Sequence, residues 1–118
     1  MREMSMLEEM LVDEYFRCER NLKIQQEYLL ENEIKGYIST KRISGREYYY
    51  LQHREGKRVL SRYIPQSKVS DLVRKLDEQK KWKKSIKNLK RDMKNIERVI
   101  GREQIEYIRG SEMNYEGR

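Results

Sequence analysis

The sequence predicts an α+β protein in which two long helices form an antiparallel coiled-coil-like hairpin, with a three-stranded antiparallel β-meander inserted between them. The two ends of the chain repeat apolar residues with the period of a helix, whereas the middle alternates with the period of a strand. Charged residues make up 40% of the 118 residues and hydrophobic residues only 36%, which suits narrow helical stripes better than a thick core. A single domain is expected over residues 1–109, followed by a flexible tail over 110–118.

The first helix is predicted over about residues 3–32, a stretch without Gly or Pro that is rich in Glu, Leu, Met and Gln. Four acidic side chains lie near its start, where the helix dipole favours negative charge. Its apolar residues step by three, four or seven and therefore share one stripe, which consists of Leu7, Leu11, Tyr15, Cys18, Leu22 and Leu29.

The β-meander is predicted over about residues 35–65, where Tyr, Ile, Val and Thr alternate with polar residues. Ser44-Gly45 and Glu55-Gly56 are expected to be its two-residue hairpin loops, because Gly accepts the positive φ that such loops need. The pairs predicted in the first hairpin are Ile43–Arg46, Lys41–Tyr48, Ile38–Leu51 and Tyr37–Gln52. Those predicted in the second include Arg54–Lys57 and Leu51–Leu60.

Alternation along these strands sorts the side chains onto two faces of the sheet. The face expected to join the core carries Ile38, Tyr49, Leu51, Leu60 and Ile64. The opposite face carries four tyrosines among basic residues, namely Tyr37, Lys41, Arg46, Tyr48, Tyr50, Arg54, Lys57 and Tyr63.

The second long helix is predicted over about residues 67–100, after Pro65, with Ser67 as its N-cap. Its apolar residues step by 3, 4, 3 and 4, the spacing of a coiled-coil seam, at Ile86, Leu89, Met93, Ile96 and Ile100. Gly101 is the expected stop, and a short helical extension is expected beyond it.

Several function classes are disfavoured by composition. One Cys and one His cannot build a zinc site, and neither GxxxxGK[ST] nor GxGxxG occurs, so we expect no metal, no cofactor and no enzyme. No run of 18 apolar residues occurs, and the acidic N-terminus does not resemble a secretory signal. The lone Cys18 suits a reducing compartment, so a cytoplasmic location without membrane contact is expected.

The charge is distributed unevenly along the chain. Residues 1–34 carry a net charge of −5, residues 35–65 carry +6, residues 66–100 carry +7 and residues 101–118 carry −1. The lysines crowded on the second long helix form a second candidate binding surface, represented by Lys80, Lys83, Lys84 and Lys87. Two alternatives stay open: the tyrosines can be a second core beneath a helix, and the lysines a solvated face that balances the acidic first helix.

The meander also carries a resemblance. The segments that carry it are Gly36–Ile38, Gly45–Leu51, Arg54–Lys57 and Ser61–Ile64. They resemble a group of small uncharacterised bacterial and mobile-element proteins in which a YYYLQ…REGK…YI meander precedes a Lys-rich helix. More loosely, the meander is similar to the three-stranded arm-type DNA-binding domain of tyrosine recombinases. That second resemblance implies DNA contact by the sheet, which in this chain is predicted to lie between two long helices.

These observations predict a non-enzymatic nucleic-acid-binding or accessory protein, with DNA as the favoured nucleic acid. Aromatic rings stack on bases, while Lys and Arg neutralise phosphates. The rival hypothesis is a protein-docking module, such as a mobile-element inhibitor of the anti-defence type that binds a nucleic-acid-processing complex, or a coiled-coil oligomerisation protein. Tyr and Arg also dominate protein interfaces, so composition does not separate the two. Homodimerisation through the helical seam is a further expectation.

Overall fold

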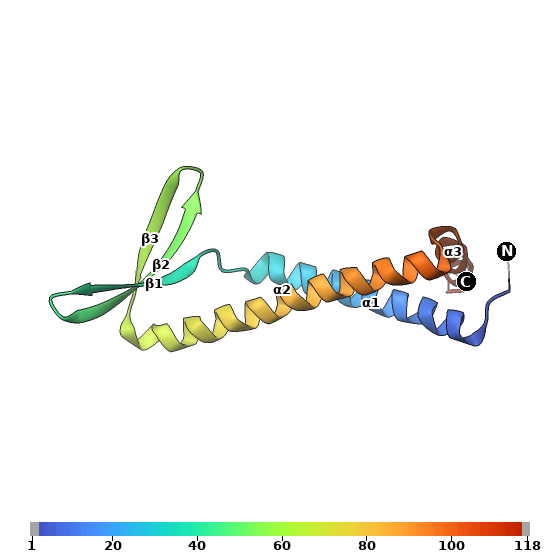
Figure 1. The fold of residues 1–118 in the computed structure, drawn as a ribbon, viewed down its shortest axis with the longest axis horizontal. Coiled ribbons are helices and arrows are strands. Elements are labelled where there is room, and N and C mark those ends of the chain that lie inside the picture. Colours follow the sequence, from blue (N-terminus) through green and yellow to red (C-terminus); the bar gives the residue numbers. More distant parts are fainter. Residues whose placement is uncertain (1–2, 117–118) are drawn as a thin grey trace. The chain divides into compact units, whose positions relative to one another are not determined.

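The computed structural model describes residues 3–116, with side chains through residue 111 (Figure 1). It confirms an α+β fold with a three-stranded antiparallel sheet inserted between two long helices, and it has a third helix where the sequence predicts a short extension. The elements in chain order are α1 (Met6–Asn32), β1 (Tyr37–Ile43), β2 (Arg46–Glu55), β3 (Arg58–Ile64), α2 (Gln66–Ile100) and α3 (Arg102–Glu116).

The chain divides into two compact units. Unit 1 combines Met1–Tyr28 with Lys84–Arg118, and unit 2 comprises Leu29–Lys83. Unit 1 therefore holds most of α1, the C-terminal part of α2 and all of α3, whereas unit 2 holds the whole sheet with the helix ends that flank it. The single domain expected over residues 1–109 stays a prediction.

The start of α1 is set by a reciprocal cap at Ser5. The backbone N–H of Glu8 donates to Ser5 Oγ at 3.2 Å, and the backbone N–H of Ser5 donates to Glu8 Oε1 at 3.2 Å. This is a capping box, in which the backbone N–H of each residue donates to the side chain of the other. It explains why α1 begins at Met6 rather than near residue 3.

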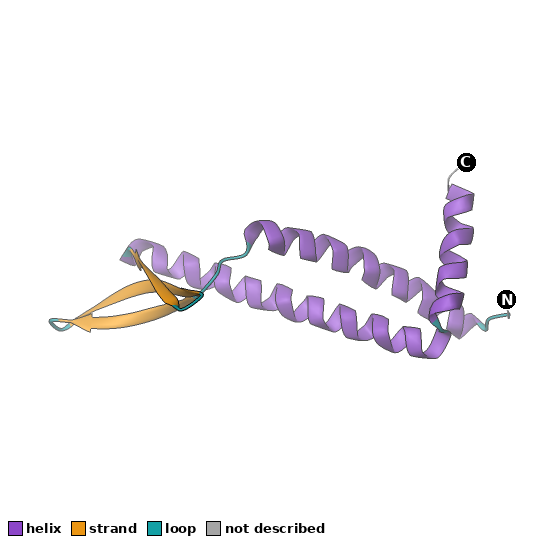
Figure 2. Ribbon diagram, turned by 90° about the horizontal axis from the view of Figure 1, so that it is seen from above, coloured by secondary structure: helices purple, strands orange, loops and turns teal. Residues whose placement is uncertain are grey.

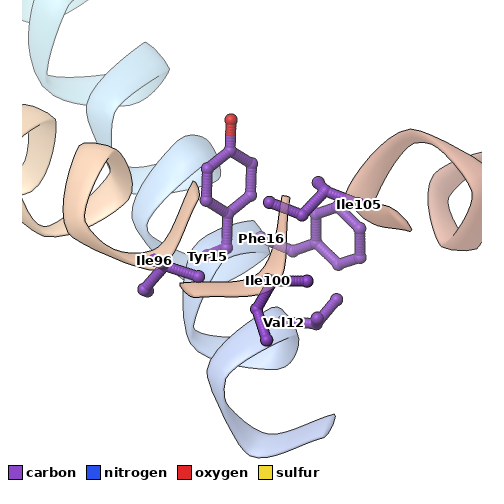
Figure 3. Close-up of a cluster of buried hydrophobic side chains, with 6 residues drawn as sticks. All are labelled: Val12, Tyr15, Phe16, Ile96, Ile100 and Ile105. Atoms are coloured by element: carbon purple, nitrogen blue, oxygen red, sulfur yellow. The ribbon is translucent and has the colours of Figure 1, made fainter. Parts of the chain in front are cut away.

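The core of unit 1 is built from all three helices (Figure 3). The six buried side chains that converge there are Val12, Tyr15 and Phe16 from α1, Ile96 and Ile100 from α2, and Ile105 from α3. The heptad stripe of α2 is confirmed: Ile86, Leu89, Ile96 and Ile100 are buried, and Met93 packs against the cluster.

The stripe predicted for α1 is partly wrong. Leu7 is 67% exposed, whereas Val12 and Phe16, which the stripe omits, are buried. Tyr15 and Cys18 are buried as expected. The reason is that α1 meets both α2 and α3 in this core, so its buried face is wider than a seam made for one partner helix.

The register of the first hairpin is confirmed at every predicted pair, from Ile43–Arg46 to Tyr37–Gln52. Ser44 (φ 51°) and Gly45 (φ 81°) both have positive φ, as a type I′ loop requires. The loop predicted for the second hairpin is wrong, because Glu55 pairs with Arg58 and the loop is Gly56-Lys57.

The physical reason for this shift is the position of Gly56 in its loop. Its φ of 60°, with no positive φ at Lys57, is the pattern of a type II′ loop, in which glycine comes first. Leu51 consequently faces Arg62 instead of Leu60, and Arg54 faces Val59. A displacement of two residues preserves alternation, so every strand residue keeps the face predicted for it.

The core face of the sheet is confirmed by burial. Leu51 and Ile64 are buried, and Ile38, Tyr49 and Leu60 are half-buried. Because β1 pairs with Arg46–Gln52 and β3 pairs with Tyr49–Glu55, all three strands lie side by side only over Tyr49–Gln52. Beyond that overlap the two hairpins diverge as separate ribbons (Figure 1).

The second long helix starts at Gln66, directly after Pro65, so Ser67 lies inside α2 and is not its N-cap. Gly101, with φ of 92°, ends α2 as predicted, and α3 leaves in a new direction (Figure 2). Residues 110–116 are helical where the sequence predicts a flexible tail, and residues 117–118 lie outside the described residues. No helix of the described chain is long and apolar enough to cross a membrane.

Candidate nucleic-acid interface

The net charge of the chain lies entirely in unit 2. This unit contains 14 basic and 7 acidic residues, for a net charge of +7, whereas unit 1 contains 13 of each and is neutral. The lysines near the end of α2 and the acids of α1 therefore balance within unit 1. A polyanion would be attracted to the unit that contains the sheet.

One face of the sheet, here called the tyrosine face, gathers aromatic and basic side chains and consists of Tyr37, Lys41, Arg46, Tyr48, Tyr50, Arg54 and Tyr63. Tyr50 and Tyr63 pair directly across β2 and β3, and their ring centroids are 5.8 Å apart in an edge-to-face arrangement. The rings of Tyr48 and Tyr63 are 6.4 Å apart. Lys41 Nζ lies 4.7 Å from the centroid of the Tyr50 ring, a cation–π contact.

The four tyrosines differ in exposure, and this separates two roles. Tyr63 is 53% exposed and Tyr37 is 60% exposed, so each offers ring surface to a partner. Tyr48 and Tyr50 are half-buried, with the Tyr63 ring beside Tyr48 and Lys41 over the Tyr50 ring. The central pair therefore supports the face, and the outer pair can stack on a flat ligand group.

The basic residues of the tyrosine face are exposed. Arg46 and Arg54 lie near opposite ends of β2, and Lys57 lies in the second loop rather than in a strand. Among the described residues, Arg46, Arg54 and Lys41 form no ion pair. In contrast, a guanidinium nitrogen of Arg42, on the other face, lies 3.6 Å from a carboxylate oxygen of Glu47. The guanidinium groups of the tyrosine face are thus available for phosphate.

The four lysines singled out on α2 are all exposed, but they do not share one unit. Lys80 and Lys83 belong to unit 2, and Lys83 Nζ lies 3.1 Å from a Glu33 carboxylate oxygen. Lys84 and Lys87 belong to the neutral unit 1. Their role as binding residues stays a prediction.

A contact that sequence reasoning missed joins the α1–β1 connection to α2. The backbone N–H of Ile34 donates to Gln79 Oε1 at 2.7 Å, and Gln79 Nε2 donates to the Ile34 carbonyl at 2.9 Å. The amide side chain thus pairs with the backbone as a neighbouring strand would. The available signal was a polar Gln in the apolar frame of the helix.

Unit 1 contains the most strongly perturbed ionisable groups. Burial raises the pKa of Tyr15 to about 12, and the 2.7 Å hydrogen bond from its hydroxyl to Glu97 Oε1 adds to the effect. Arg109 donates to both carboxylate oxygens of Glu19 and ties α3 to α1. These groups hold helices together, because Tyr15 of α1 bonds to Glu97 of α2 and Arg109 of α3 bonds to Glu19 of α1.

Cys18 and His53 are the single cysteine and the single histidine of the chain. Cys18 is a fully buried free cysteine. Burial raises the pKa of its thiol, so little reactive thiolate forms. His53 Nε2 lies 3.3 Å from a Glu55 carboxylate oxygen. No group of three potential metal ligands occurs among the described residues.

Comparisons with known proteins give one match. Residues 7–75, more than half of the chain, match the family described as "Domain of unknown function (DUF6788)". The matched region begins in α1 and includes the complete sheet and the first part of α2. No curated protein and no solved structure matches the chain.

Proposed function

The chain belongs to the family described as "Domain of unknown function (DUF6788)", and we propose that it is a non-enzymatic nucleic-acid-binding or accessory protein that binds through its tyrosine face. The observation that carries this proposal is the coincidence of exposed tyrosine rings, unpaired guanidinium groups and the whole net charge of +7 in unit 2. The proposed partner is DNA or another nucleic acid, and the proposed location is the cytoplasm.

The chemistry of this face suits a phosphodiester chain. Arg46 and Arg54 would neutralise phosphates, which sets how steeply affinity falls with salt. Tyr37 and Tyr63 would stack on bases, which adds affinity that salt affects little. Neither role requires a metal, a cofactor or a nucleophile.

A protein-docking module is the second candidate, and one observation favours it. Ile43 and Val59 pair with Arg46 and Arg54 of the tyrosine face, lie on the same side of the sheet and are 51% and 53% exposed. Exposed apolar residues beside tyrosine and arginine are typical of protein interfaces. The partner in this case would be a protein, including one bound to nucleic acid, as expected for an inhibitor from a mobile element.

Fluorescence anisotropy with labelled DNA and RNA at several salt concentrations tests the proposal. Arg46→Gln combined with Arg54→Gln should make the negative slope of log affinity against log salt shallower by about 1.4 to 1.8, because two phosphate contacts are lost. The matched control is Arg42→Gln with Arg58→Gln, which removes the same charge from the opposite face. Absence of wild-type binding at low salt would contradict the proposal and favour protein docking.

We also propose that α1 and α2 pair as an antiparallel coiled-coil-like hairpin and that the protein can self-associate through exposed apolar side chains of its helices. Support for the pairing comes from the shared core of unit 1, where Val12 and Phe16 meet Ile96 and Ile100. Support for self-association comes from Met6, Met10 and Val99, each more than 60% exposed.

A further inference from the structure

A groove in unit 2 follows the outer edge of the sheet, where β3 leads into α2. Its volume is about 400 Å³, and its lining includes Arg62, Lys68 and Lys75 together with the apolar residues Ile34, Ile64 and Leu72. Its lining also includes Tyr63, whose side chain lies on the opposite face of β3 from that of Arg62. β3 is an edge strand of the sheet, so the groove is lined in part by residues of a sheet edge.

The groove carries a positive charge that is only partly compensated. Its lining contains three basic residues and one acidic residue, Asp71. Asp71 accepts a hydrogen bond from Arg74 at 2.7 Å and lies 3.2 Å from Lys75 Nζ, so its charge is already shared between two partners. Within the described chain, the side chains of Arg62 and Lys68 form no ion pair.

Tyr63 connects the groove to the tyrosine face. It lines the groove, and its half-exposed ring also contacts Tyr48 and Tyr50. A base stacked on Tyr63 would therefore have its sugar and phosphate at the mouth of a groove that offers Arg62 and Lys68. Apolar walls and a cationic rim together fit a nucleotide unit better than an inorganic anion.

We propose that this groove binds the backbone of a single nucleic-acid strand whose base stacks on Tyr63, so that the protein prefers single-stranded to double-stranded nucleic acid. This inference rests on the proposed function and specifies its ligand. A duplex buries the faces of its bases in the stack, so Tyr63 could reach only base edges or backbone. An unpaired strand exposes a base face and its adjoining phosphate together.

Fluorescence anisotropy of the full chain tests the inference with a labelled oligothymidylate of about 12 nucleotides and with a duplex of equal length. The single strand should bind about tenfold more tightly or better. Tyr63→Ala should reduce single-strand affinity by about tenfold without changing the salt slope, since stacking releases no counterions. Circular dichroism should show wild-type helix content in every variant compared.

The charges of the groove provide matched variants. Arg62→Gln with Lys68→Gln should make the negative single-strand salt slope shallower by about 1.4, and Arg42→Gln with Arg58→Gln, equal in charge, should change it less. Asp71→Asn should tighten single-strand binding, an effect that misfolding cannot produce, and Asp77→Asn, outside the groove, should tighten it less.

The outcomes separate this inference from the function on which it rests. Equal affinity for strand and duplex, with the groove variants behaving as their controls, would overturn the groove while leaving nucleic-acid binding intact. Displacement of the oligonucleotide by thymidine monophosphate at equal nucleotide concentration would indicate a site for free nucleotides and overturn the strand proposal. Absence of any binding at low salt would overturn both proposals and leave protein docking.

Discussion

Single side chains join elements that the hydrophobic pattern leaves unconnected. Gln79 satisfies both backbone groups of Ile34, and Tyr15 donates to Glu97 at the edge of the unit 1 core. Each contact links residues far apart in the chain, and each gives a polar group a hydrogen-bond partner within the protein. Replacing either side chain should therefore have a measurable effect.

Replacing Gln79 with Leu should leave the Ile34 N–H without its partner at similar side-chain volume. The expected cost is about 1–3 kcal/mol, since a partly buried donor loses its hydrogen bond. Amide hydrogen exchange followed by NMR should show faster exchange at Ile34 in this variant. Lys80→Leu, on an exposed position of the same helix, should leave that rate unchanged, and equal rates in both variants would contradict the role of Gln79.

Because the pKa of Tyr15 is raised in the folded protein, we expect the protein to lose stability at alkaline pH. This pKa is raised to about 12 in the folded protein, whereas a tyrosine of the unfolded chain titrates near 10. The folded state therefore holds the proton more tightly. The stabilisation is complete below about pH 10 and is lost as the pH rises towards 12.

Urea unfolding of wild type and Tyr15→Phe over this pH range measures the effect. The difference in unfolding free energy between the two should shrink as the pH rises from about 10 to about 12. Tyr107→Phe is the matched control, because Tyr107 is an exposed tyrosine of the same unit. A constant difference between wild type and Tyr15→Phe would exclude this linkage.

At the scale of the element, the two hairpin loops differ in the φ values that they require. Ser44 has a positive φ that serine tolerates poorly, whereas Lys57 has none. Ser44→Asn should therefore stabilise the first hairpin by about 0.5 kcal/mol, because Asn-Gly is the preferred type I′ pair. Urea midpoints should rise for Ser44→Asn and not for Lys57→Asn; a rise in both would assign the gain to something other than loop geometry.

The proposed pairing of α1 with α2 would depend on the buried stripe of α2. Leu89→Asp places a charge at a buried position and should cost at least about 3 kcal/mol, with loss of the cooperative thermal transition in circular dichroism. Val99→Asp is the control, since Val99 lies on the same helix but is 63% exposed. Similar melting of both variants would argue against a helix pair closed by this stripe.

At the scale of the whole molecule, the division of charge predicts where binding energy arises. Unit 2 carries +7 and unit 1 is neutral, although both contain segments of α2. Lys84→Gln with Lys87→Gln should therefore change the salt slope of nucleic-acid binding less than Arg46→Gln with Arg54→Gln, when both are measured by anisotropy. A larger effect from the lysine pair would move the interface onto α2.

Local chemistry made much of this protein predictable from its sequence. Alternation and the Ser44-Gly45 loop were sufficient for the register of β1 and β2, because a two-residue loop and a two-residue period leave one solution. The same period assigned Tyr63 and Arg54 to the tyrosine face even though the loop of the second hairpin was placed wrongly. The end of α2 at Gly101 and its heptad were likewise predictable, because each depends on residues that are close together in the chain.

What the tertiary structure decided depends on contacts between distant residues. Only the fold shows that Val12 and Phe16 face the core instead of Leu7, since α3 returns to α1 and widens its buried face. Only the fold sets Tyr63 and Lys68 around one groove and gathers the net charge in unit 2. Periodicity determines which side of its own element a residue occupies, but packing between elements determines what that side meets, and burial and charge balance follow from packing.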